Sequence, residues 1–240
     1  MAIRGILFDK DGTLIDYQRT WVPINRAVAY HAAGGEPALV RELLRRNGQD
    51  PDTDRVTPGS VLAVGSIDDI AAAFSQQLGA RTPLSLSADI DRLYSEGGAR
   101  HAALIAGVEA TILELKRRGF RLGVASNDSA GGLLASLGGL GILELFDFTA
   151  GCDSGFGGKP DPRMALGFCR ALEIGPQEMA VVGDARHDLV MGRAAGAALN
   201  IGVLSGTSTR AELEGYADLI VGSIRDLLEC CAFKTRLGAR

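Results

Sequence analysis

Residues 3–15 of the chain read IRGILFDKDGTLI, an apolar run that stops abruptly at a group of charged residues. The run from Ile3 to Phe8 has the length and composition of a short buried β-strand that ends at Asp9. A second carboxylate, Asp11, follows two positions later. Ligands of an open parallel sheet bind outside the carboxyl ends of the strands. If this strand belongs to such a sheet, Asp9 and Asp11 lie at a binding edge.

Strands and helices alternate along the second half of the chain. A helix over 108–118, ended by Gly119, precedes an apolar strand over 120–125. Further strands are predicted at 146–151, 179–183, 198–204 and 219–221, with helices at 131–137, from 162 onward and at 188–195. This alternation predicts an α/β fold with right-handed crossovers, a doubly wound and mainly parallel Rossmann-like sheet.

A helical stretch interrupts the alternation directly after the first strand. Apolar residues recur at three-and-four spacing over 23–33, 36–46, 67–78 and 88–99. The Pro/Gly/Asp-rich segment 47–65 reads as a loop, with 60–64 ambiguous between loop and strand. We therefore expect a core built from 1–16 and 101–240, with an inserted α-helical domain over 17–100.

Composition narrows the class of protein. The 240 residues include 29 acidic and 25 basic side chains, a formal net charge of −4, which argues against a nucleic-acid partner. Hydrophobic residues make up 46%, enough for a packed core. Four cysteines without metal-site spacing favour a reducing compartment. No segment has the pattern of a signal peptide or membrane span, so the sequence predicts a cytoplasmic protein without a membrane partner.

More polar residues follow the later strands. Ser126 and Asn127 end the second strand, Asp184 ends the fourth with Asp188 four residues on, and Lys159 stands just before a helix. Two carboxylates about 4 Å apart repel by roughly 4 kcal/mol at an effective dielectric of 20, so such a group needs a cation. Oxygen ligands of this kind suit Mg²⁺, which also accepts phosphate oxygens. With Lys159 as a second positive charge, the pattern predicts a phosphate-bearing substrate.

These stretches together resemble the four ordered motifs of the haloacid dehalogenase superfamily, and its phosphatase branch in particular. The resemblance is carried by DKDGTL at 9–14, Ser126-Asn127, GKPDP at 158–162, and Gly183-Asp184 with Asp188. The insert is similar to the helical type-one cap of the phosphoglycolate phosphatase-like group. Two positions depart from the usual pattern of that group, because Asp16-Tyr17 stands where Asp-Ser is common and Ala106-Gly107 where Pro-Gly is common.

The resemblance implies a role for each motif residue. Asp9 would be the nucleophile that forms an aspartyl-phosphate and a ligand of Mg²⁺, and Asp11 would be the general acid and base, its backbone carbonyl also binding the metal. The remaining roles concern the phosphate and the metal. Ser126 and Asn127 would bind phosphoryl oxygens, Lys159 would offset their charge, Asp184 would ligate Mg²⁺, and Asp188 would hold a metal-bound water.

The function expected from these roles is Mg²⁺-dependent hydrolysis of a small phosphomonoester, phosphoglycolate first, by a monomer or homodimer. Two alternatives stay open: a sugar-phosphate mutase of the β-phosphoglucomutase type, and a non-enzymatic receiver-like module that keeps its aspartyl-phosphate. Candidate substrate contacts in the insert are Tyr17, Arg19, Trp21, Arg55, Thr57 and Ser60.

Three further features have ordinary explanations. His187 is expected to be an exposed residue at a helix start, and Cys230-Cys231 to pack within a helix. The segment from Lys234 to Arg240 is expected to be a frayed end.

Overall fold

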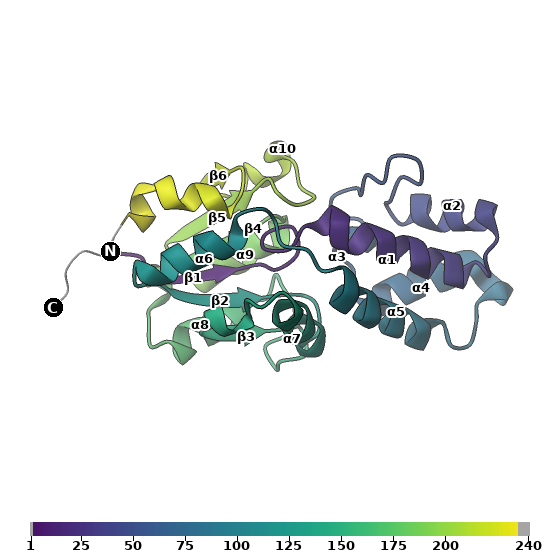
Figure 1. Cartoon of the computed structure of the whole chain (residues 1–240), viewed down its shortest axis with the longest axis horizontal. Helices are drawn as coiled ribbons and strands as arrows, with labels where there is room; N and C mark the ends of the chain where they lie inside the picture. The colour runs from purple at the N-terminus through teal and green to yellow at the C-terminus, as the bar shows by residue number, and fades with distance from the viewer. Residues whose placement is uncertain (1, 235–240) are drawn as a thin grey trace. The chain divides into compact units, whose positions relative to one another are not determined.

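The computed structural model describes residues 2–234, which divide into two compact units. The first contains the chain up to Asp16 and from Leu104 onward, and the second is Tyr17–Ala103. Figure 1 shows a sheet with helices in the first unit and helices alone in the second. The helical unit includes three residues more than the expected insert at 17–100, because its last helix continues to His101.

The sheet of the first unit has six strands in the order β3-β2-β1-β4-β5-β6, and every pairing is parallel. The doubly wound α/β fold predicted from the alternation is therefore confirmed. The strands are β1 Gly5–Phe8, β2 Arg121–Ala125, β3 Phe148–Ala150, β4 Met179–Gly183, β5 Leu199–Val203 and β6 Leu219–Val221. The first strand lies at the centre, where Phe8 is in register with Val124 on one side and Val182 on the other. The carboxyl ends of these three strands consequently meet at one edge.

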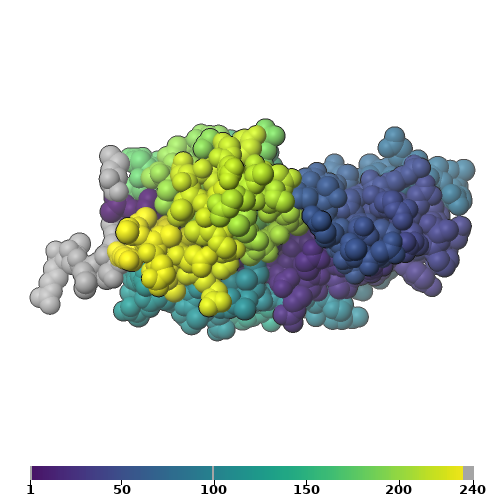
Figure 2. Space-filling view, turned by 90° about the horizontal axis from the view of Figure 1, so that it is seen from above, coloured from purple at the N-terminus to yellow at the C-terminus, as the bar shows by residue number. Residues whose placement is uncertain are grey.

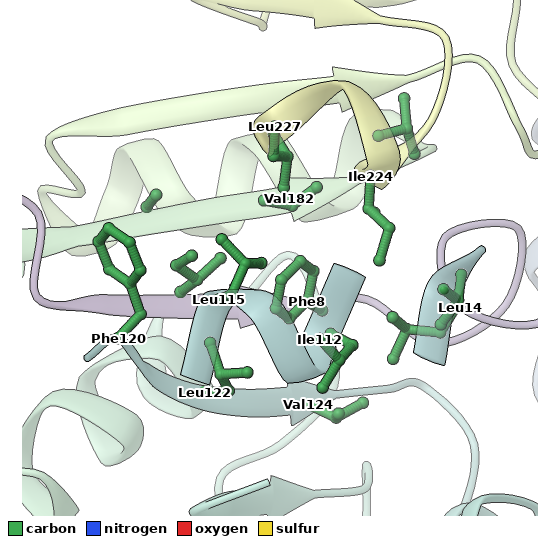
Figure 3. Packing of buried hydrophobic residues seen from close by; sticks show 14 of the residues in the cluster. Phe8, Leu14, Ile112, Leu115, Phe120, Leu122, Val124, Val182, Ile224 and Leu227 are labelled. Atoms are coloured by element: carbon green, nitrogen blue, oxygen red, sulfur yellow. The ribbon is translucent and has the colours of Figure 1, made fainter. Parts of the chain in front are cut away.

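Side chains of the central strands alternate between two apolar cores, as the pleat requires. Ile6 and Phe8 point into one core, which also holds residues of α6 and η4, as Figure 3 shows for Phe8. Leu7 points into the other, against residues of α8 and α9. The helical elements of this unit are α6 Val108–Arg117, α7 Ala130–Gly139, η2 Leu143–Leu145, α8 Arg163–Ala171, η3 Pro176–Glu178, α9 Arg186–Ala195, α10 Arg210–Leu213, η4 Ile224–Glu229 and η5 Cys231–Phe233. Burial on both faces explains why the strands read as continuous apolar runs.

The second unit is a helical domain with a core of its own. Its elements are α1 Tyr17–Ala32, α2 Pro37–Arg46, α3 Val61–Val64, α4 Ile67–Leu78, η1 Gly79–Arg81 and α5 Leu86–His101. The first helix begins six residues before the expected start at residue 23. Tyr17, Trp21 and Ile24 are buried at helical spacing, whereas Pro23 lies inside the helix on its exposed face. The ambiguous segment 60–64 contains the short helix α3.

The C-terminal segment covers part of the first unit. It forms two short 3₁₀ helices, η4 Ile224–Glu229 and η5 Cys231–Phe233, and the first of these packs against α6 (yellow and teal in Figure 2). Cys231 is exposed. Cys230 packs against the apolar core but lies between the two helices, so the expectation that both cysteines pack within a helix is wrong for each of them. The expected frayed end falls, beyond Lys234, outside the described residues. Over residues 2–234, none of the helices combines the length and apolar character that a bilayer span requires.

Candidate active site

Three carboxylates from distant parts of the chain meet at the carboxyl edge of the sheet. Asp9 follows β1, Asp184 follows β4, and Asp188 lies in the first turn of α9. One oxygen of each lies within 4.8 Å of the others, and all three residues are buried. The parallel register of the sheet brings them together, since the Asp9 N–H donates to the Val182 carbonyl across the strand ends at 2.8 Å.

Lys159 lies between two of these carboxylates. Its ammonium donates to Asp9 Oδ1 at 2.5 Å and to Asp188 Oδ1 at 2.6 Å, and its side chain is fully buried. Asn127 holds the lysine backbone on both sides, because its Oδ1 accepts from the Lys159 N–H at 2.7 Å and its Nδ2 donates to the Lys159 carbonyl at 3.3 Å. The stretch that carries Lys159 is thus tied to the end of β2.

The crowding of charge shifts the pKa of each carboxyl. Burial, only partly opposed by the charge of Lys159, raises the pKa of Asp9 to about 7. Burial and the neighbouring carboxylates Asp9 and Asp188 raise the pKa of Asp184 well above its usual value. Burial alone would raise the pKa of Asp188 too, but the charges of His187 and Lys159 and two hydrogen bonds lower it. The group with the most cationic neighbours therefore ionises most readily.

The donor set of this cluster fits a divalent cation. Asp9 Oδ2 is buried, and no hydrogen-bond partner within residues 2–234 reaches it. When ionised, the three carboxylates and the single ammonium of Lys159 leave two negative charges, which one divalent cation would neutralise. Carboxylate oxygens are ligands that Mg²⁺ prefers. Asp9, Asp184 and Asp188 could thus hold the ion. The Asp11 side chain is not part of this cluster, and its expected contribution was its backbone carbonyl.

A second lysine at the site was not predicted from the sequence. Lys10 is completely buried, and its ammonium lies 2.7 Å from Asp128 Oδ2 and 3.1 Å from Asp11 Oδ2. Burial alone would lower the pKa of Lys10, but the charges of Asp11 and Asp128 raise it. The sequence feature that could have indicated its role is its position between Asp9 and Asp11, just after a buried strand.

Ser126 lies at the end of β2 with little exposure (2%). Its hydroxyl oxygen accepts from the Asp128 N–H at 3.1 Å, and its own N–H donates to the Ala150 carbonyl at 2.9 Å. The second expected phosphate-binding residue, Asn127, uses its amide on the Lys159 backbone. The end of β2 is thus a compact turn that places Ser126 beside the residues following β1.

The loop that follows β5 also contributes, without a recognisable motif. The Thr207 N–H donates to Asp184 Oδ2 at 2.8 Å, and the Ser205 hydroxyl donates to the Gly12 carbonyl at 2.7 Å. Space is tight here, since a Cβ at Gly206 would overlap the Asp184 carboxylate. Gly12 has a φ of 84°, and a Cβ there would lie 2.7 Å from Asp184 Oδ2, so glycine is required twice.

Two expectations for other residues need revision. His187 was expected to be exposed, but its side chain is only 23% exposed and its Nε2 lies 3.4 Å from Asp188 Oδ1. The turn into α9 is held by the Ala185 N–H, which donates to Asp188 Oδ2 at 3.1 Å. In the helical unit, Tyr17 and Trp21 belong to the apolar core, and the Tyr17 hydroxyl donates to the Leu62 carbonyl.

Of the remaining candidate substrate contacts, Arg19, Arg55 and Thr57 are exposed and Ser60 is half-buried. These positions remain candidates for substrate contacts by their exposure alone.

Comparison with known proteins points in the same direction as the geometry. Phosphoglycolate phosphatase of Shigella sonnei (strain Ss046) is 29% identical over 241 positions, covering 94% of this chain and 91% of the relative. N-acetylmuramic acid 6-phosphate phosphatase of Pseudomonas putida is 27% identical over 196 positions, covering 82% and 81%. The crystal structure of CbbY from Rhodobacter sphaeroides in complex with phosphate superposes with a TM-score of 0.68 at 28% identity, covering 94% of this chain and 96% of that one.

The family profile of the haloacid dehalogenase-like hydrolases matches residues 3–196, a range that contains all the motif residues described above. The chain therefore belongs to the haloacid dehalogenase-like hydrolases.

Proposed function

We propose that this protein is a Mg²⁺-dependent phosphatase that hydrolyses a small phosphomonoester through an aspartyl-phosphate on Asp9. The observation that carries the proposal is the pairing at the sheet edge: Lys159 bonds one oxygen of Asp9, while the other oxygen is buried without a partner within the described residues. A cation and a phosphoryl group would give that cluster the charges it lacks.

Each side chain at this edge has its own role in the proposed reaction. Asp9 attacks phosphorus and Asp11 gives a proton to the leaving oxygen, so that the P–O bond to the alcohol breaks as the bond to Asp9 forms. Asp11 then takes a proton from the water that hydrolyses the intermediate. Lys159 and the Ser126 hydroxyl stabilise charge on the phosphoryl oxygens. Lys159 is well placed for this because its ammonium already contacts the nucleophile.

The metal would be held by Asp9 and Asp184, with Asp188 and the Asp11 carbonyl completing the set. A bound Mg²⁺ supplies charge neutralisation, which lets an anionic substrate approach an anionic nucleophile. Within the chain, the Thr207 N–H and Lys159 keep the Asp184 and Asp188 carboxylates oriented. These hydrogen bonds support the assignment, because carboxylates that ligate a metal are usually hydrogen-bonded in turn.

Phosphoglycolate is the substrate we propose to test first, in keeping with the relative from Shigella sonnei. The relative from Pseudomonas putida is similar to almost the same degree and acts on a sugar phosphate, so that class belongs in the same panel. The proposal includes a cytoplasmic location, which four free thiols favour, and a monomer or homodimer as the assembly.

The test is phosphate release from a panel of phosphomonoesters, with Mg²⁺ and with excess EDTA. We expect hydrolysis only with the metal, loss of activity in Asp9→Asn, and one phosphoryl group on the wild-type chain by mass spectrometry after acid quench. A mutase would yield isomerised sugar phosphate and little inorganic phosphate. A receiver-like module would keep its label without turnover. Hydrolysis that persists in Asp9→Asn would refute the proposal.

A further inference from the structure

Two buried lysines share the carboxylates around the end of β1. Lys159 pairs with Asp9 and Asp188, whereas Lys10 pairs with Asp11 and Asp128. Both lysine side chains are fully buried. The nucleophile and the acid–base group of the proposed function thus have separate cationic partners, although they are only two residues apart in the chain.

The contacts of Lys10 connect two loops of the sheet edge. Its ammonium donates to Asp128 Oδ2 at 2.7 Å and lies 3.1 Å from Asp11 Oδ2. Asp128 is itself anchored, because its Oδ1 accepts from the Ser129 N–H at 2.8 Å and its N–H donates to the Ser126 hydroxyl oxygen at 3.1 Å. Lys10 therefore ties the Asp11 carboxylate to the turn that follows β2.

Stability alone does not account for a lysine at this position. Its two partners are each about a quarter exposed, with side-chain exposures of 24% for Asp11 and 22% for Asp128, so water could solvate them without it. The lysine, in contrast, loses all its hydration. A buried ion pair is weak evidence for stability, because the cost of desolvating the charges offsets much of their attraction. The distinct effect of the Lys10 charge is to hold the Asp11 and Asp128 carboxylates in fixed positions relative to one another.

We propose that Lys10 is a positioning residue that holds the Asp11 carboxylate in the orientation needed for proton transfer, by tethering it to Asp128. The inference rests on the proposed function, in which Asp11 protonates the leaving oxygen. Without the contact to Lys10, the Asp11 carboxylate has more freedom about its side-chain torsions and spends more of its time out of reach of that oxygen. The tether removes this freedom before substrate binds, which is the general benefit of a preorganised site.

The test compares two leaving groups in Lys10→Met. Single-turnover rate constants are measured with p-nitrophenyl phosphate and with 2-phosphoglycolate or glycerol 3-phosphate, whichever the wild type hydrolyses faster. A nitrophenolate departs with little need of a proton, whereas an alkoxide does not. General acid catalysis contributes about 10²–10⁴-fold, so we expect a loss of about 10²-fold with the alkyl ester and less than about tenfold with the aryl ester. The KM values should stay close to those of wild type.

Further variants separate positioning from folding. Lys10→Met combined with Asp128→Asn removes both charges of the tether, and it should fold at least as well as the single variant while the alkyl ester stays slow. Lys116→Met is the matched control, since Lys116 is a lysine of the same unit that bonds the Leu145 carbonyl at 2.8 Å, away from the sheet edge. It should keep both rates.

The outcomes are distinct. Equal losses with both esters, no loss in Lys10→Met, or recovery of the alkyl rate in the double variant would each overturn the positioning role while leaving the phosphatase intact. A wild-type protein that hydrolyses no phosphomonoester of the panel would instead remove the proposed function and the inference with it.

Discussion

Replacing the proposed nucleophile should make the metal-free protein more stable. Burial raises the pKa of Asp9 from 3.8 to about 7, and the side chain has almost no water around it (7% exposed). One pKa unit corresponds to about 1.4 kcal/mol, so the ionised carboxylate destabilises the fold by on the order of 4 kcal/mol above pH 7. Asp9→Asn carries no charge and keeps the shape, so it should recover much of this.

The sign of the pH dependence follows from the same shift. The pKa of Asp9 is higher in the folded chain, so between about pH 4 and about pH 7 the folded chain holds a proton that the unfolded chain has lost. Stability therefore falls as pH rises through this window. The difference in the free energy of unfolding between Asp9→Asn and wild type should be near zero at about pH 4 and should reach its full value at about pH 8. A gain of roughly 2–4 kcal/mol corresponds to about 5–10 °C in Tm for a chain of this size.

Thermal unfolding followed by circular dichroism, in EDTA at about pH 5 and about pH 8, measures this difference. Asp52→Asn serves as the control, because Asp52 is a surface carboxylate (65% exposed) paired with Arg41, and its Tm should match that of wild type at both pH values. Added Mg²⁺ should raise the Tm of wild type and have little effect on Asp9→Asn. If the Tm of Asp9→Asn is equal to or below that of wild type at about pH 8 in EDTA, the ionised Asp9 carboxylate does not destabilise the fold as argued.

Three other predictions concern the neighbours of Asp9. Lys159→Met should lower kcat/KM by about 10²–10³-fold, because it removes the ammonium that Asp9 and Asp188 share. Steady-state phosphate release measures kcat/KM, and a loss of less than about tenfold would contradict the prediction. Mg²⁺ at 100 times its Kd should stabilise the wild type by about 2.7 kcal/mol in thermal melts, and Asp184→Asn should show no such shift at the same concentration. Thr207→Pro removes the N–H that holds Asp184 and should raise the Mg²⁺ concentration for half-maximal activity about 10–100-fold. Thr207→Ala keeps the N–H, loses only the longer hydroxyl contact to Asp184 at 3.4 Å, and should behave close to wild type.

The residues at the strand ends could be predicted from the sequence because strand direction is encoded locally. A buried strand is a short apolar run, and in a parallel sheet all such runs end at one edge. That rule alone brings Asp9, Ser126 and Asp184 to the same edge, as the register of β1 with β2 and β4 shows. The helical domain was harder, since Pro23 suggested a helix start and instead lies on the exposed face of α1.

The partners of those residues could not be predicted, because nothing local encodes them. Lys10 and Asp128 are 118 positions apart, and the interaction depends on how two turns at adjacent strand ends fold back. Thr207 acts mainly through its backbone N–H, which donates to Asp184 Oδ2 at 2.8 Å and which every residue except proline possesses, whereas its hydroxyl lies farther from the same oxygen at 3.4 Å, so its residue type carries little signal. The partial burial of His187 has a similar origin, because the groups that act on it include Lys159, which is distant in the sequence.

The two aspartates of the first motif illustrate why tertiary partners, not residue types, assign chemical roles. Asp9 and Asp11 are identical in type and two positions apart, yet Asp9 is 7% exposed beside Lys159, whereas the Asp11 side chain is 24% exposed beside Lys10. A nucleophile works best fixed and shielded against the phosphorus that it attacks, and an acid–base group must reach both a leaving alcohol and an incoming water. The difference in burial matches that division of labour. Lys159 contacts the nucleophile and Lys10 contacts the acid–base group, so a substitution at Lys10 should affect proton transfer to and from Asp11, whereas a substitution at Lys159 should affect the charge balance at Asp9.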